Sequence, residues 1–139
     1  MIKTSKFSTN LITSLSLAEG LRGLSPGEQA RIFRVAMGLP LGEPGNAAAV
    51  GLQDALIREE FNEWQFATSN ENELERLASL VFACFQLAAA RGWSLDTAMQ
   101  RVFESNMTKL DNEGNPVKNA AGEVMKGPNY VPPDFSDLV

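Results

Sequence analysis

Apolar side chains recur at alternating steps of three and four residues along three long segments of this chain, which is the spacing of one face of an α-helix. The segments are 48–67, 71–91 and 95–109. A chain of 139 residues is long enough for one domain with a real core and too short for two comfortable ones. The spacing therefore predicts an all-α fold, a bundle of four or five helices.

Local capping signals place the helix boundaries. Ser25 is typical of a helix N-cap, because Pro26 follows at the first helical position and Glu28 at the third. The helix Gln29–Met37 is expected to end at Gly38. The later boundaries are a break and cap at Thr68-Ser69-Asn70, a stop at Gly92 and a cap at Ser94.

The two ends of the chain differ from this helical middle. Residues 1–24 are expected to be an N-terminal extension with a short helix around Leu11–Leu21, and residues 25–139 to be one domain. The tail is rich in turn formers, and two short segments, Pro116–Lys118 and Glu123–Lys126, flank Asn119–Gly122. This pattern predicts a short C-terminal β-hairpin followed by an extended, proline-rich arm.

Composition excludes several kinds of site. The chain has no histidine and one cysteine, Cys84, which excludes His-based zinc sites, Ser-His-Asp triads and disulfides within the chain. Acid–base or metal chemistry must then use carboxylates, lysines, the single tyrosine Tyr130, or water. The net charge of −5 argues against nucleic acid and anionic membranes as partners. Cys84 inside an apolar run and the lack of a membrane-length apolar run predict a cytoplasmic protein.

Two glutamates interrupt the apolar face of the segment 48–67. The positions at helical spacing are Leu52, Leu56, Glu59, Glu63 and Phe66, and Glu60 lies about 100° from Glu59 on the same side. We expect the solvent face to lie elsewhere, on Asp54, Arg58, Asn62 and Gln65. Buried carboxylates must be paired, bind a metal or take up protons. These glutamates therefore predict a functional site and not a solvent-exposed helix face.

The other two segments also carry polar residues on their apolar faces. The face of 71–91 contains Arg76, with Ser79 beside it, and the face of 95–109 ends in Asn106 and Lys109. Asn106 and Lys109 alone are equally well explained as the wet end of a helix. Taken together, three polar clusters on three apolar faces predict a shared polar pocket between helices.

Four sequence stretches resemble the MazG-like superfamily of all-α nucleoside triphosphate pyrophosphohydrolases, and especially its phosphoribosyl-ATP pyrophosphohydrolase-like branch. They are RIFRVAMGLP at 31–40, LIREEFNEW at 56–64, RGWSLDTAMQRVFESNMTKL at 91–110 and KGPNYVPPDF at 126–135. The E-E-x-x-E motif in the second stretch is moderately specific. The last two stretches, in this order and at this distance, are the strongest signal.

The resemblance implies a reaction and a site. These proteins cleave a nucleoside triphosphate into a monophosphate and pyrophosphate, with magnesium (or manganese) held by E-E-x-x-E and by an E-x-x-D motif on the next helix. Carried over, Glu59, Glu60 and Glu63 would be metal ligands or a water-orienting base. The residues that would hold the nucleotide are Asn106, Lys109, Lys126, Asn129 and Tyr130. The family builds its site between subunits, so the resemblance also implies a homodimer or a higher homo-oligomer.

The sequence departs from the family at the second metal motif, where E-x-x-D is replaced by Arg76-Leu77-Ala78-Ser79. Arg76 would either pair with Glu59 or Glu63 in place of the metal, or contact the triphosphate while one metal stays on the glutamates. Two functions remain open at this point. The chain is a pyrophosphohydrolase with an incomplete metal site, or a non-catalytic nucleotide-binding or structural homologue. A bare helical oligomerisation module would leave KGPNYVPPDF unexplained.

Overall fold

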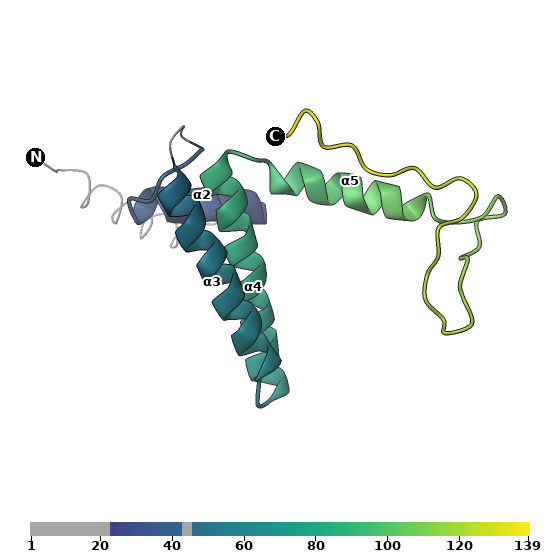
Figure 1. Cartoon of the computed structure of the whole chain (residues 1–139), viewed down its shortest axis with the longest axis horizontal. Coiled ribbons are helices and arrows are strands. Elements are labelled where there is room, and N and C mark those ends of the chain that lie inside the picture. Colours follow the sequence, from purple (N-terminus) through teal and green to yellow (C-terminus); the bar gives the residue numbers. More distant parts are fainter. Residues whose placement is uncertain (1–22, 43–45) are drawn as a thin grey trace, which may run out of the picture. The chain divides into compact units, whose positions relative to one another are not determined.

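The computed structural model describes residues 23–42 and 46–139, and this part of the chain contains four helices and no strand (Figure 1). The helices are α2 (Pro26–Ala36), α3 (Ala47–Gln65), α4 (Asn70–Arg91) and α5 (Leu95–Met107). For the described residues the all-α prediction is confirmed. The helix expected around Leu11–Leu21 lies outside them.

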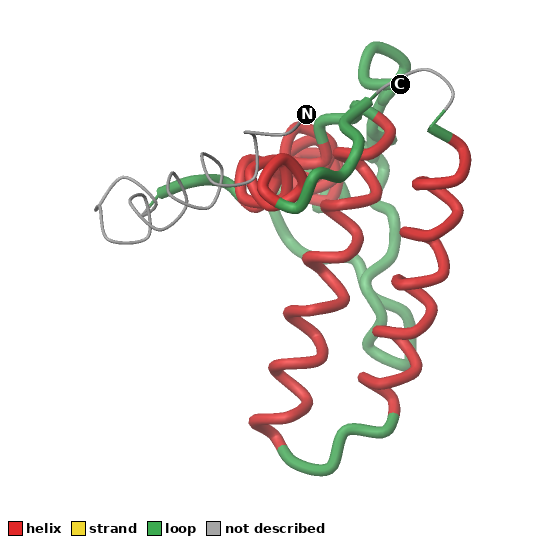
Figure 2. The backbone as a smooth tube through the Cα atoms, turned by 90° about the vertical axis from the view of Figure 1, so that its left-hand side faces the viewer, coloured by secondary structure: helices red, strands yellow, loops and turns green. Residues whose placement is uncertain are grey.

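The chain divides between Leu95 and Asp96 into two compact units, which are described separately. In the first unit α3 and α4 form an antiparallel hairpin (Figure 2). Gln53 of α3 contacts Ala83 of α4, and Glu63, further along α3, contacts Arg76, nearer the start of α4. The shorter helix α2 packs against α4, where the rings of Phe33 and Phe82 meet edge to face with centroids 5.5 Å apart.

The helix boundaries follow the capping chemistry of the sequence. The Ser25 hydroxyl accepts from the Glu28 amide at 3.2 Å, and the Glu28 carboxylate accepts from the Ser25 amide at 2.7 Å, a reciprocal capping box. The Ser69 hydroxyl accepts from the Asn72 amide at the start of α4. Gly92, with φ of 75°, ends α4 in the left-handed conformation that glycine adopts without strain.

The core of the first unit is built from small side chains on α4. The buried apolar residues of the described chain are Ala30, Ala83, Phe85, Ala88, Ala89 and Ala90. Alanines allow the helix backbones to approach closely, but they bury little apolar area each. Leu74, Leu77 and Val81 on another face of α4 remain exposed. Phe85 is thus the single large apolar side chain in the described core, and much apolar surface of this unit stays uncovered.

The face of α3 that packs on α4 differs from the one predicted. Leu52 is 62% exposed and Phe66 is 80% exposed, so the expected face containing Glu59 and Glu63 is wrong as the packing face. The buried Gln53 and the partly buried Ile57, Glu60 and Trp64 face α4 instead, a stripe about 100° around the helix. The reason is that Gln53, although polar, finds hydrogen-bond partners inside the unit. The expected solvent face, at Asp54, Arg58, Asn62 and Gln65, is exposed as predicted.

In the second unit the C-terminal arm runs back along α5 and is held by three side chains of this helix or its end. Ser105 donates to the Val131 carbonyl at 2.7 Å, and the Val131 amide donates to the Thr108 hydroxyl at 2.8 Å. Arg101 contacts both oxygens of the Asp137 carboxylate. The expected hairpin corresponds to a turn closed by one antiparallel bridge, between Lys118 and Val124, so its strands stay a prediction.

Among the described residues, no single helix is both long and apolar enough to cross a membrane. The consecutive helices α4 and α5 have sufficient length and hydropathy only when they are taken together.

Candidate functional site

An ion pair joins α3 and α4 where the sequence placed a polar cluster. The Arg76 guanidinium donates to the Glu63 carboxylate, and the two side chains are 36% and 40% exposed. Ser79 is partly buried and lies about one turn further along α4, on the side that faces α3. Of the two alternatives for Arg76, the contact with an α3 glutamate is therefore present, and Glu63 is the partner.

The other two glutamates have different surroundings. Glu59 is exposed, whereas Glu60 is partly buried on the stripe of α3 that packs on α4. The Oε2 atom of Glu60 and the Nε1 atom of Trp64, one turn later, are buried and make no hydrogen bond within the described part of the chain. A carboxylate oxygen and an indole N–H on neighbouring turns are an acceptor and a donor free for a small polar partner.

These three glutamates do not fit a shared metal site in this chain. In the described ranges 23–42 and 46–139, no three His, Cys, Asp or Glu side chains form a group that could hold a metal ion. Glu63 is already engaged by the cation of Arg76. Mg²⁺ takes oxygen ligands in near-octahedral geometry and completes its shell with water, but here Glu59 is exposed, Glu60 faces α4 and Glu63 is paired with Arg76, so the three carboxylates do not form one ligand group. The magnesium implied by the family resemblance remains a prediction.

In the second unit, the end of α5 and the segment 126–131 pack against each other. A Cβ atom at Gly127 would lie 2.5 Å from the carbonyl oxygen of Lys109, so only glycine permits this contact. The Lys126 ammonium lies 4.7 Å from the centroid of the Tyr130 ring, a cation–π contact. The predicted nucleotide-binding residues Lys109, Lys126 and Tyr130 therefore belong to two segments in direct contact.

The two asparagines predicted for the same site are placed differently. Asn129 donates to the side-chain oxygen of Asn112, which ties the segment 126–131 to the loop after α5. Asn106 lies in the last turn of α5 with an exposed side chain, and its carbonyl accepts from the Lys109 amide at 3.2 Å. The predicted site residues thus fall into two groups, an acidic one with Arg76 in the first unit and one with Lys109 and Lys126 in the second, and the shared pocket stays a prediction.

A buried polar network in the first unit was not expected from the sequence. Arg34 is 1% exposed, donates to the Pro40 carbonyl at 2.8 Å and donates to the Gln53 side chain at 3.3 Å. Gln53 in turn donates to the Ala83 carbonyl. Burial lowers the pKa of Arg34, but a guanidinium keeps its charge at any ordinary pH. The only sequence signal for this network was an arginine at helical spacing from Ala30.

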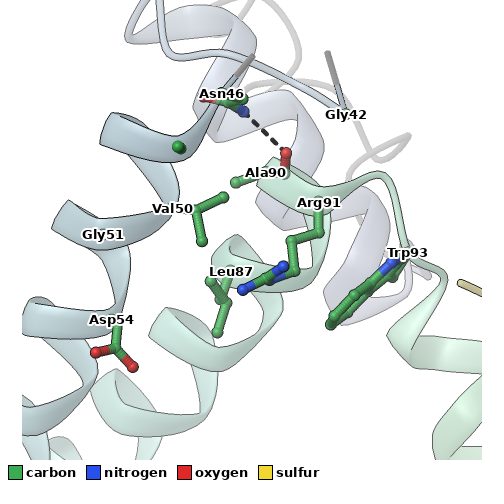
Figure 3. A pocket seen from close by; sticks show the side chains of 10 residues that line it. Gly42, Asn46, Val50, Gly51, Asp54, Leu87, Ala90, Arg91 and Trp93 are labelled. Atoms are coloured by element: carbon green, nitrogen blue, oxygen red, sulfur yellow. Dashed lines mark hydrogen bonds between the residues drawn. The ribbon is translucent and has the colours of Figure 1, made fainter. Parts of the chain in front are cut away.

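A cavity of about 800 Å³ lies where the end of α4 meets the start of α3 (Figure 3). The Arg91 guanidinium stands 4.8 Å from the centroid of the Trp93 ring, and Asn46 donates to the Ala90 carbonyl at 2.9 Å. Asp54 also lines this cavity. Sequence reasoning did not single out this cavity, because its residues come from two segments far apart in the chain.

Comparison with known proteins adds no assignment: no protein-family model and no curated protein matches this chain.

Proposed function

We propose that this chain is a nucleoside triphosphate pyrophosphohydrolase-like protein of MazG-like type, which binds a nucleotide through its phosphates. The observation that carries this proposal is the contact between the end of α5 and the segment 126–131. Two lysines and a tyrosine share these touching segments in a chain whose net charge is −5. Lysine side chains on two touching segments suit a small phosphate-bearing ligand.

In this proposal each residue has a defined task. Lys109 and Lys126 meet the phosphate charge, and the Tyr130 ring stacks on the base or donates its hydroxyl. Glu60 keeps one carboxylate oxygen without a partner in the described chain, and this oxygen would orient a water molecule. The family's magnesium would supply polarisation of the phosphoryl group, but the three glutamates do not form a group that could hold it in the described part of the chain.

A second candidate function is binding of the same nucleotide without turnover. The pairing of Glu63 with Arg76 favours it, because a carboxylate engaged by a guanidinium is a poor metal ligand and a poor base. In this version the nucleotide is held by the second unit, and the acidic cluster is a structural remnant.

The experiment measures binding and turnover on the same samples. A panel of ribo- and deoxyribonucleoside triphosphates is titrated by calorimetry and then incubated with Mg²⁺ or Mn²⁺, and pyrophosphate and monophosphate are quantified. Binding with release of both products supports the hydrolase, and binding without products supports the second candidate. A chain that binds no nucleotide in the panel overturns both.

Replacement of Lys126 locates the binding site. Loss of a charge-assisted contact in Lys126→Ala should weaken nucleotide binding by about 1.5–3 kcal/mol. Lys118→Ala is the matched control, since Lys118 is an exposed lysine of the same unit that lies at the turn bridge. Equal losses in both variants would indicate general charge attraction instead of a site.

The proposal includes self-association through the first unit. Leu52 and Phe66 on α3 and Leu74 on α4 are 62%, 80% and 68% exposed, while the described core buries one large apolar side chain, Phe85. A second copy of the same chain would cover this exposed apolar surface of α3 and α4. Cyclic homodimers are the commonest assembly of soluble proteins. Sedimentation equilibrium should give a dimer for the parent and a shift toward monomer for Leu52→Glu with Phe66→Glu. A monomeric parent would exclude this part of the proposal.

A further inference from the structure

We propose that Arg76 is a permanent, built-in counter-cation for the acidic cluster of α3, so that this cluster operates without any divalent metal. The reference to a metal rests on the proposed function, since the metal is what the family resemblance implies. The ion pair itself is an observation of this chain. The proposal therefore has a direct physical test that does not depend on whether the chain binds or cleaves nucleotides.

The charges around the cluster show what Arg76 must balance. Glu59, Glu60 and Glu63 fall within five consecutive positions of α3, and Arg76 is the cation that contacts one of them. The arginine of α3 itself, Arg58, pairs with Asp54 on the solvent face, and these two side chains are 76% and 53% exposed. In the described chain the contacts therefore assign Arg58 to the surface and Arg76 to the glutamates.

Arginine is well suited to replace a metal charge. A guanidinium cannot lose its proton in a protein, and its planar fork donates several hydrogen bonds to carboxylate oxygens. A metal ion entering between the same carboxylates would meet a positive charge at short range and would have to displace it. The pair is more than one-third exposed, so we expect its own contribution to stability to be modest and its main effect to be the exclusion of other cations.

Ser79 completes this arrangement. It lies three residues after Arg76 on the side of α4 that faces α3, where a second carboxylate would add a metal ligand. A neutral hydroxyl adds neither charge nor a strong ligand for Mg²⁺. Both substitutions, a cation at 76 and a hydroxyl at 79, change the local charge in the same direction, toward a site that needs no metal.

The test compares divalent-cation dependence in the full chain and three variants. Thermal melts and calorimetric titrations with Mg²⁺ and with Mn²⁺ are recorded for the parent, for Arg76→Glu with Ser79→Asp, for Arg76→Gln and for Arg58→Glu. Arg58→Glu is the control, because it replaces an exposed arginine on α3 with an acid, a change of two charges compared with three in the double variant.

We expect no binding heat and an unchanged melting temperature in the parent and in the control. The double variant should bind the ion and melt at least ~5 °C higher at saturating metal, because a ligand stabilises the state that binds it. Arg76→Gln, which removes the cation without adding acid, should show a smaller shift of the same sign.

A parent that binds Mg²⁺ or Mn²⁺ and gains as much stability as the double variant would overturn the proposal. So would an Arg76→Gln variant that remains folded and shows no response to either ion. If the double variant does not fold, the parent and Arg76→Gln still decide the question. Nucleotide binding is measured separately, so failure of the proposed function and failure of this proposal give different results.

Discussion

The side-chain amide of Gln53 on α3 donates to the backbone carbonyl oxygen of Ala83 on α4 at 3.2 Å, in the buried centre of the first unit. The other end of the same amide accepts from the buried Arg34 of α2. One glutamine thus links α2, α3 and α4, the three helices described in this unit. The carbonyl of Ala83 already serves the α4 helix, so Gln53 uses its second lone pair without breaking the helix.

Gln53→Leu should destabilise the first unit although it replaces a polar side chain with an apolar one of similar size. The change leaves the Arg34 guanidinium without its α3 acceptor, and an unsatisfied buried polar group costs about 1–3 kcal/mol. Urea denaturation of parent and variant measures the free energy of unfolding. Gln65→Leu, on the exposed side of α3, is the control and should be close to neutral. A stable Gln53→Leu variant would show that Arg34 has other acceptors.

Gly51→Ala should stabilise α3. Gly51 lies inside the helix, its φ is helical, and a Cβ atom there would meet no other atom within 4 Å. Replacing an exposed helical glycine with alanine typically adds about 1 kcal/mol to the free energy of unfolding.

Gly42→Ala is the opposite case and serves as the comparison for this prediction. A Cβ atom at Gly42 would lie 2.9 Å from the Cα atom of Gly92, and its φ of 53° disfavours any side chain. Thermal melts should therefore move in opposite directions for the two variants. A higher melting temperature for both variants would mean that the backbone can move Gly42 away from Gly92 at little cost.

Gly127→Ala should open the contact between the end of α5 and the segment 126–131. The added methyl would lie 2.5 Å from the Lys109 carbonyl and 2.9 Å from the Leu110 carbonyl, so the backbone must move. Tryptic cleavage after Lys126 should become faster, because proteases cut segments that open locally. Cleavage after Lys118, which is already exposed, provides an internal control in the same sample. Equal rates after Lys126 in parent and variant would contradict this account.

Features set by neighbouring residues could be predicted from the sequence. The capping box of Ser25, the cap at Ser69 and the stop at Gly92 were all expected, because each depends on atoms within one helical turn. The pairing of Arg76 with a glutamate of α3 was one of the two alternatives predicted for Arg76, and Glu63 is the partner.

Features set by distant partners could not be predicted. The packing face of α3 was misjudged because Gln53 is buried only by virtue of Ala83, 30 residues away, and of Arg34 on another helix. Hydrophobic periodicity counts Gln53 as polar and Leu52 as apolar, and both assignments mislead here. The cation–π contact of Lys126 with Tyr130 depends on a turn whose shape the residue types alone do not specify.

The hold of α5 on the C-terminal arm should weaken in acid. Hydrogen bonds from Arg101 lower the pKa of Asp137 to about 2, from an ordinary value of 3.8. Because the pKa is depressed in the folded chain, the stabilising effect is fully present above pH ~4 and is lost as the pH falls toward ~2. NMR titration of the Asp137 carboxyl carbon measures this midpoint, and the Val131 amide reports on the arm.

Arg101→Gln is the control for the acid titration. Without the guanidinium, the Asp137 midpoint should return to an ordinary carboxyl value near ~3.9. A parent midpoint that already lies in this range would mean that the contact with Arg101 is not maintained in solution.

The buried guanidinium of Arg34 also restricts how α2 can be seated on its neighbours. The acceptors of Arg34 are one backbone carbonyl, at Pro40, and one side chain, Gln53. Sliding α2 along α3 and α4 by one helical turn, about 5.4 Å, would carry the charge away from Gln53 and into contact with apolar side chains. A buried charge without an acceptor is strongly unfavourable, whereas small residues such as Ala83 and Ala89 would accept α2 in several positions. The arginine therefore favours the observed register of α2, together with the ring contact between Phe33 and Phe82.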